Sequence, residues 1–229
     1  MRNIHLVKKM KIESYEPFHI GSKFLYYVDK GHLLGKIYEY YETNLDEGFE
    51  LNSNILRGEQ SFLPIFNILN NPKKKLTLQM NTSANALNVI GNEPKEVIGF
   101  FKKLMKNLPN LGFELDSTFV FYEIITNIII LLDDGEIKPK EIFKKLSSNL
   151  FSGIQNLPNL SVNHIRFSDS LIARESDERF NLEILPNRTS PNKRIILKIL
   201  KRVNNYEELI QFYEGFKSLI KKIYQELVK

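Results

Sequence analysis

Residues 94–104 of the chain read Pro-Lys-Glu-Val-Ile-Gly-Phe-Phe-Lys-Lys-Leu, and residues 139–146 return as Pro-Lys-Glu-Ile-Phe-Lys-Lys-Leu. Proline suits the first turn of a helix because its missing N–H would have no partner there, and the following glutamate lies near the positive end of the helix dipole. Both segments are therefore predicted to begin helices. The sequence Asn-Leu-Pro-Asn-Leu occurs at 107–111 and again at 156–160, and each copy precedes a stretch typical of a strand.

These repeats have two interpretations. An internal duplication would give two related halves that divide near residue 110. Lysine-rich helices that begin with Pro-Lys-Glu are also common, and short matches between them arise without shared ancestry. Both interpretations predict the same succession of helix, proline turn and strand.

Hydrophobic periodicity predicts the remaining elements. In the last part of the chain Leu209, Phe212 and Phe216 recur at spacings of three and four residues, which is typical of an amphipathic helix over 206–228. Alternation and turn residues predict strands at 9–15 (ended by Pro17), 76–80, 87–90, 162–167, 180–185 and 194–203, and either one long strand over 113–132 or two that break near Ser117. They also predict a hairpin of 24–28 with 36–41 and a short helix at 62–69.

The predicted fold class is α+β, with an antiparallel or mixed sheet and helices packed on one face. The two candidate halves, residues 1–110 and 111–229, would each contain a hairpin followed by a helix and would pack together as one compact unit. A duplicated, saddle-shaped sheet of the TATA-binding kind is an architectural analogy for this arrangement, although no family motif accompanies it.

Composition indicates an ordinary folded protein of 229 residues, 42% of them hydrophobic and 26% charged. The chain has no cysteine, which excludes disulfides, a cysteine nucleophile, iron–sulfur clusters and cysteine-ligated zinc. The N-terminus does not resemble a signal peptide, and no apolar run is long enough to span a membrane. We therefore expect a cytoplasmic protein that does not bind membranes.

Signatures of catalysis are absent from the sequence. No nucleophile elbow, phosphate-binding loop or dinucleotide-binding fingerprint is present. The four histidines are not spaced as metal ligands, so neither a metal nor another cofactor is predicted. The strongest enzymatic interpretation is a magnesium-dependent nuclease, in which an acidic pair would hold the metal near a lysine. Its candidate residues are Asp116, Asp133, Asp134, Glu136 and Lys138.

One predicted strand has a feature specific to binding. Along residues 194–203 the alternation places Arg194, Lys198 and Arg202 on one face, with Ile196 and Leu200 between them. Such a basic stripe is typical of sheets that bind nucleic acid, and it is equally typical of an edge strand that lysine and arginine protect from aggregation. A run of three lysines, Lys73, Lys74 and Lys75, could extend the stripe.

The favoured function is a non-enzymatic binding or assembly module, in which Ile196 and Leu200 contact a protein partner or a second copy of the chain. The alternative is a protein that binds DNA or RNA through the basic stripe. A net charge of +5 and a pI near 9.1 permit this alternative without requiring it. The magnesium-dependent nuclease is a distant third hypothesis.

Overall fold

The computed structural model describes residues 10–52, 65–132, 138–144, 164–169 and 178–227. Within these ranges nine strands form one sheet in the order β2-β3-β4-β5-β1-β6-β9-β8-β7, and every neighbouring pair is antiparallel. The strands are β1 (Lys11–Phe24), β2 (Glu50–Leu51), β3 (Ile65–Asn71), β4 (Leu76–Asn81), β5 (Ala86–Gly91), β6 (Phe119–Leu131), β7 (Ile165–Ser168), β8 (Arg179–Pro186) and β9 (Arg194–Val203).

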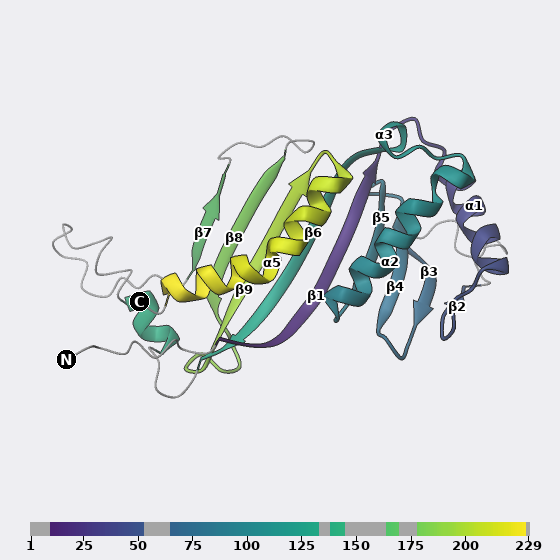
Figure 1. Ribbon diagram of the computed structural model, residues 1–229. Helices are drawn as coiled ribbons and strands as arrows, with labels where there is room; N and C mark the ends of the chain where they lie inside the picture. Colours follow the sequence, from purple (N-terminus) through teal and green to yellow (C-terminus); the bar gives the residue numbers. More distant parts are fainter. Residues whose placement is uncertain (1–9, 53–64, 133–137, 145–163, 170–177, 228–229) are drawn as a thin grey trace.

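Two long helices, α2 (Pro94–Asn107) and α5 (Tyr206–Leu227), lie across the same face of the sheet (Figure 1). Helix α2 packs on β1 and β5, and α5 packs on β6 and β9. The prediction of an α+β fold with helices on one face is therefore confirmed. The other helical segments are α1 (Lys30–Thr43), the single turns at Pro109–Leu111 and α3 (Leu115–Thr118), and residues 139–144.

The two longest strands, β1 and β6, pair at the centre of the sheet. Their register sets Ile20 opposite Ile124 on the helix-covered face, where both side chains are fully buried. Phe18 lies two residues before Ile20 on the same face of β1. Its ring contacts the ring of Phe216 in α5 edge to face, with centroids 6.1 Å apart. The core thus lies between the central strands and the two long helices.

The arrangement of elements repeats along the chain. The succession β1, α1, β2 to β5 and α2 is followed by β6, the helical residues 139–144, β7 to β9 and α5. In each succession the last strand pairs with the first: β5 pairs with β1, and β9 pairs with β6. Whether this repetition reflects duplication of the sequence stays a prediction, and the second Asn-Leu-Pro-Asn-Leu copy lies outside the described residues.

The predicted hairpin of 24–28 with 36–41 is wrong, because α1 occupies most of it. Asp29 caps the helix by accepting a hydrogen bond from the backbone N–H of His32 at 3.1 Å. Leu33, Ile37 and Tyr41 then follow at four-residue spacing, and all three are buried. The aromatic content of the segment favours a strand locally, but burial of this helical face outweighs it.

Two further expectations fail for related reasons. Strand β1 does not end at Pro17, because a shift in register between Tyr15 and Phe18 forms a bulge that accommodates the proline without a ladder hydrogen bond. Strand β3 occupies the segment expected to form a helix at 62–69, since Phe66 and Ile68 alternate into the core opposite β4. Residues 62–64 lie outside the described ranges.

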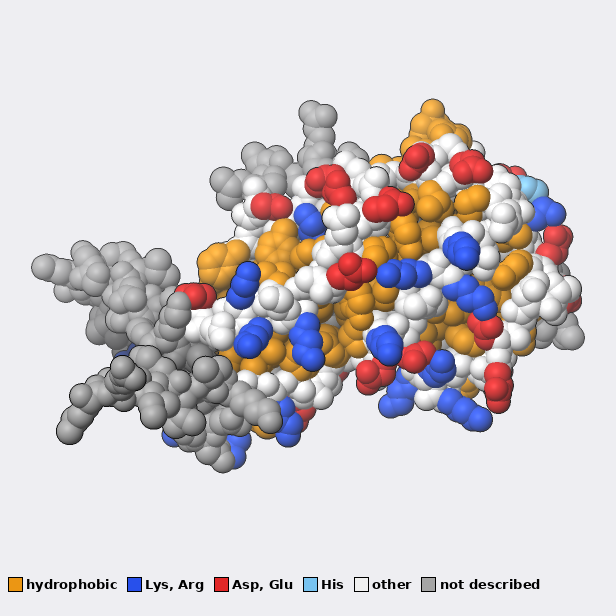
Figure 2. Space-filling model, in the orientation of Figure 1, with side chains coloured by type: hydrophobic (Ala, Val, Ile, Leu, Met, Phe, Trp, Pro, Cys, Tyr) orange, Lys and Arg blue, Asp and Glu red, His pale blue; other side chains and the backbone are white. Residues whose placement is uncertain are grey.

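The helix-covered face carries a mixture of basic and acidic side chains over exposed apolar ones (Figure 2). One ion pair joins the two long helices, with Lys102 Nζ 3.7 Å from a carboxylate oxygen of Glu214. Among the helices of the described ranges, none has both the length and the apolar character needed to cross a membrane.

Neighbouring isoleucines on β6 provide a test of this assignment of faces. We expect Ile124→Ala to lower the free energy of unfolding by about 2–5 kcal/mol, because it removes a fully buried side chain and leaves a cavity. Ile125→Ala changes the same residue type one position away on the opposite face and should cost about 1 kcal/mol. Urea denaturation measures both; equal losses would contradict the assignment of Ile125 to a face outside the core.

Candidate functional site

The face of the sheet opposite α2 and α5, called the open face below, carries an aliphatic patch on β6 and β9. None of α1, α2 and α5 lies on this face. In the β6–β9 register Ile125 is opposite Leu200, and Ile129 is opposite Ile196. Ile129 is 9% exposed and the other three are partly exposed. The predicted interface residues Ile196 and Leu200 therefore lie together, each beside an isoleucine that sequence reasoning had not selected.

The open face carries mostly polar side chains on the outer strands β3 and β4, although Ile65 at the start of β3 is 48% exposed there. There Thr77 and Gln79 alternate with buried leucines, and Gln79 Nε2 donates a hydrogen bond to Asn67 Oδ1 at 2.7 Å. This is the usual pattern for an antiparallel sheet with one face in water. The patch on β6 and β9 departs from that pattern, because aliphatic side chains take positions where polar ones are expected.

A shallow hollow of about 700 Å³ adjoins the patch at the start of β9. Its apolar floor consists of Ile129, Leu185, Pro186 and Ile196. Charged side chains from three segments surround the floor, so a ligand in the hollow would contact aliphatic groups at the centre and ionic groups at the margin. The charged side chains are Glu13, Glu16, Arg188, Arg194 and Lys198.

The three predicted cations of β9 lie on the open face, and each has a carboxylate partner. Arg194 donates two hydrogen bonds to Glu13 of β1, and these hold the pKa of Glu13 below its usual value. Lys198 Nζ lies 3.9 Å from a carboxylate oxygen of Glu183 on β8. Arg194 and Lys198 thus each meet a carboxylate on another strand, and Lys198 shares its carboxylate with Arg166.

Arg202 is the third cation, and its surroundings are unlike those of the other two. It is 5% exposed, its guanidinium lies 3.7 Å from the centroid of the Phe121 ring, and its Nη2 donates to Glu123 Oε2 at 2.7 Å. The aromatic ring and the carboxylate together hold the guanidinium in one orientation. Arg202 is thus a fixed group within the sheet surface rather than a mobile surface cation.

The three lysines of the run at 73–75 do not join the stripe on β9. They lie in the turn between β3 and β4, and strands β5, β1 and β6 separate β4 from β9. Lys74 instead reaches toward α2, where its Nζ is 2.7 Å from Glu96 Oε2. The sequence of residues 73–75 does not indicate that these lysines lie far from β9, because that distance depends on the order of the strands in the sheet.

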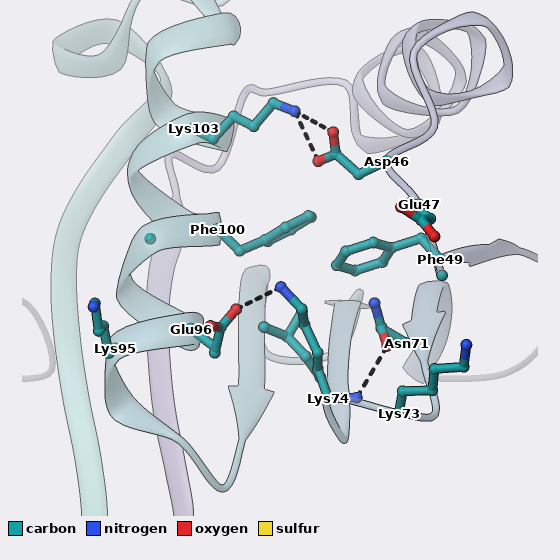
Figure 3. A pocket seen from close by; sticks show the side chains of 13 residues that line it. Asp46, Glu47, Phe49, Asn71, Lys73, Lys74, Lys95, Glu96, Phe100 and Lys103 are labelled. Carbon is teal, nitrogen blue, oxygen red and sulfur yellow. Dashed lines mark hydrogen bonds and ion pairs between the residues drawn. The ribbon is translucent and has the colours of Figure 1, made fainter.

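A second hollow, of about 670 Å³, lies between that turn, α2 and the segment before β2 (Figure 3). The rings of Phe49 and Phe100 stack at its centre with centroids 5.1 Å apart. Ion pairs close it on two sides, one between Lys74 and Glu96 and one in which Lys103 Nζ binds Asp46 at 2.6 and 2.7 Å. These contacts fasten the turn and the segment to α2, so the hollow is stabilised by paired charges.

Tyr41 packs on the far side of the same aromatic group. Its ring stacks on Phe100 with centroids 6.0 Å apart, and burial raises its pKa above the usual value for tyrosine. No acceptor or donor within the described structure pairs with its buried hydroxyl. The hydroxyl therefore stays protonated over the physiological pH range.

The described part of the chain contains no cluster of side chains suited to bind a metal ion. No group of three or more His, Asp or Glu side chains there is arranged to hold a metal ion. Of the nuclease candidates, Asp116 lies in the first turn of α3 and Lys138 precedes the helical residues 139–144, whereas Asp133, Asp134 and Glu136 lie outside the described residues. The nuclease hypothesis thus gains no geometric support.

Comparisons with known proteins do not assign this site. No protein-family model matches the chain, and no curated protein matches it significantly.

The Glu13–Arg194 pair predicts a pH-dependent contribution to stability. Because the folded pKa of Glu13 is lowered, its contribution is complete above the pKa of unfolded glutamate, about 4.3, and is lost as pH falls through the lower folded value. Glu13→Gln should therefore lower the free energy of unfolding at neutral pH, and the difference from wild type should shrink below about pH 4.3.

Urea denaturation at neutral pH and at about pH 3 would measure that difference. Glu16→Gln is the matched control, because Glu16 is exposed on the same strand and accepts a hydrogen bond from the Ser14 hydroxyl at 3.1 Å instead of pairing with an arginine in the described part of the chain. A Glu13 effect of the same size at both pH values would contradict the assigned ion pair.

Proposed function

We propose that the protein is a non-enzymatic binding or assembly module that docks a protein partner, or a second copy of itself, on the open face. The observation that supports this proposal is the aliphatic patch: Ile125 faces Leu200 and Ile129 faces Ile196 on the same face where strand β4 presents Thr77 and Gln79. Partly exposed aliphatic side chains gain free energy when a partner removes their remaining surface from water.

The surroundings of the patch also suit a protein interface. Such interfaces combine an apolar centre with a polar rim, and charged residues are depleted at the centre. Here Arg194 pairs with Glu13 at one end of the patch, whereas Lys198, which reaches Glu183, lies opposite Asn127 between the two aliphatic pairs. A partner that covers the patch would leave the Arg194–Glu13 pair hydrated at the rim and would have to place an acceptor or a carboxylate over Lys198.

Nucleic acid is the weaker proposal for the same face. Lysine and arginine bind phosphates by releasing counterions, which requires cations that are not already neutralised. The cations proposed to follow a phosphate backbone each have a carboxylate within 4.0 Å, namely Glu13, Glu183 and Glu123. A phosphate backbone would therefore compete with three internal ion pairs.

The proposal predicts that charge placed in the patch abolishes binding. We expect Ile196→Glu/Leu200→Glu to remove both self-association in sedimentation velocity and specific protein partners in affinity purification with quantitative mass spectrometry. The matched control is Thr77→Glu/Gln79→Glu, which adds the same charge to the polar part of the same face and should retain them. Circular dichroism melting would establish that both variants fold.

Fluorescence anisotropy with labelled DNA and RNA separates the two proposals. We expect no binding at near-physiological salt. Binding that survives such salt and is lost in a folded Arg194→Glu/Lys198→Glu/Arg202→Glu variant would replace the protein-docking proposal with the nucleic-acid one. Absence of any partner, together with a strictly monomeric protein, would also overturn the docking proposal.

A further inference from the structure

The open face has a regular composition along the seam where β6 pairs with β9. On each side of the seam an aliphatic residue, a polar residue and a second aliphatic residue follow one another. The opposite pairs, in register from one end, are Ile125 with Leu200, Asn127 with Lys198, and Ile129 with Ile196. The two strands thus present the same order of aliphatic and polar side chains at the same levels, although they run in opposite directions.

The polar pair at the middle of the seam has further capacity for hydrogen bonds. The side-chain amide of Asn127 is partly exposed and bonds to no group in the described part of the chain. Lys198 is exposed, and its Nζ lies 3.9 Å from a carboxylate oxygen of Glu183, a carboxylate that also lies 3.8 Å from Arg166 Nε. An ammonium group has three donors and an amide offers an acceptor oxygen, so both can bind groups of another molecule.

A twofold axis that runs along the seam would place β6 of one copy over β9 of a second copy. Sheets that pack face to face keep their strand directions within about 30° of each other, and an axis nearly parallel to the strands produces this arrangement. Each aliphatic residue of the seam would then face an aliphatic residue of the other copy. Asn127 would face Lys198, whose ammonium can donate to the amide oxygen. Twofold interfaces require such self-complementarity, because the same surface contributes both halves.

We propose that the seam between β6 and β9 is the centre of a twofold-symmetric, face-to-face interface between two copies of this chain. This inference rests on the proposed docking function and identifies the partner as a second copy. An unrelated partner would need its own row with the same aliphatic and polar order, whereas a second copy supplies that row. The Arg194–Glu13 and Arg202–Glu123 ion pairs bound the seam at its two ends, which leaves the aliphatic residues near its centre, as in protein interfaces.

The chain contains no cysteine, so a single introduced cysteine reports its distance from the same residue in a second copy. With the axis between β6 and β9, Lys198 lies about one strand spacing to the side of Lys198 in the second copy, across two sheets about 10 Å apart. Lys198→Cys should therefore crosslink to itself with a short bismaleimide and give a covalent dimer.

Thr77→Cys is the matched control for the crosslinking experiment, because Thr77 lies on the same open face. Its strand, β4, is the fourth strand from the proposed axis. The two copies of residue 77 would therefore lie about 34 Å apart, at about 4.8 Å for each strand spacing, and should remain uncrosslinked. Labelling with a monofunctional maleimide would establish that both introduced thiols react.

Asn127→Lys tests the polar pair without a crosslinker. The variant places a second ammonium group opposite Lys198 of the other copy, at two symmetric positions of the dimer. Because like charges that meet across an interface repel each other, dimerisation should weaken about 10-fold or more in sedimentation equilibrium. Thr77→Lys adds the same charge outside the interface and should leave dimerisation unchanged. Circular dichroism melting would establish that both variants fold.

Several results would overturn this interface: a monomeric wild-type protein, crosslinking at position 77 instead of 198, or unchanged dimerisation in a folded Asn127→Lys variant. The broader docking proposal has a separate outcome. It survives the loss of this inference if affinity purification recovers a specific partner that the Ile196→Glu/Leu200→Glu variant loses. Both fail if the protein is monomeric and no such partner is found.

Discussion

The antiparallel pairing of β1 with β6 is the constraint on which the other features depend. These are the two longest strands, and their register runs from Lys11 opposite Leu131 to Phe24 opposite Phe119. Because side chains alternate between faces, a slip of one residue would move Ile20 and Ile124 out of the core. The pairing joins β5 and β9 to opposite sides of one centre, so both α2 and α5 pack on the same face.

Because both long helices cover one face, the character of the open face is set by the strand residues whose side chains point away from the helices. On β3 and β4 most of these residues are amides and threonine, which hydrogen-bond to water, and Ile65 is the aliphatic exception. On β6 and β9 they are aliphatic pairs at one position and ionic groups at the next. The difference between the two regions therefore arises from the composition of individual strands on a shared sheet.

The ionic groups on the open face are of two kinds. Arg194 and Lys198 each reach a carboxylate on a neighbouring strand, and their side chains remain about one-third and one-half exposed, so their pairs are screened by water. Arg202 is instead buried against an aromatic ring, and the neighbouring Arg179 has a buried donor without a partner. The first kind consists of partly solvated ion pairs, whereas the second is held in place by contacts within the sheet surface.

The sequence by itself determined the elements whose local pattern and tertiary packing agree. Helix α5, with Leu209 and Phe216 on one stripe, and strand β9, with Arg194, Lys198 and Arg202 on one face, are of this kind. Tertiary structure alone decided three other features: that 30–43 is a helix, which carboxylate each cation meets, and that Arg179 faces Arg202. Helix α1 depends on burying Leu33, Ile37 and Tyr41, and the ionic contacts depend on strand order, which brings Glu13 beside Arg194 and Glu123 beside Arg202. Local propensity does not encode a partner that lies many residues away, because only the register of the folded sheet sets that contact.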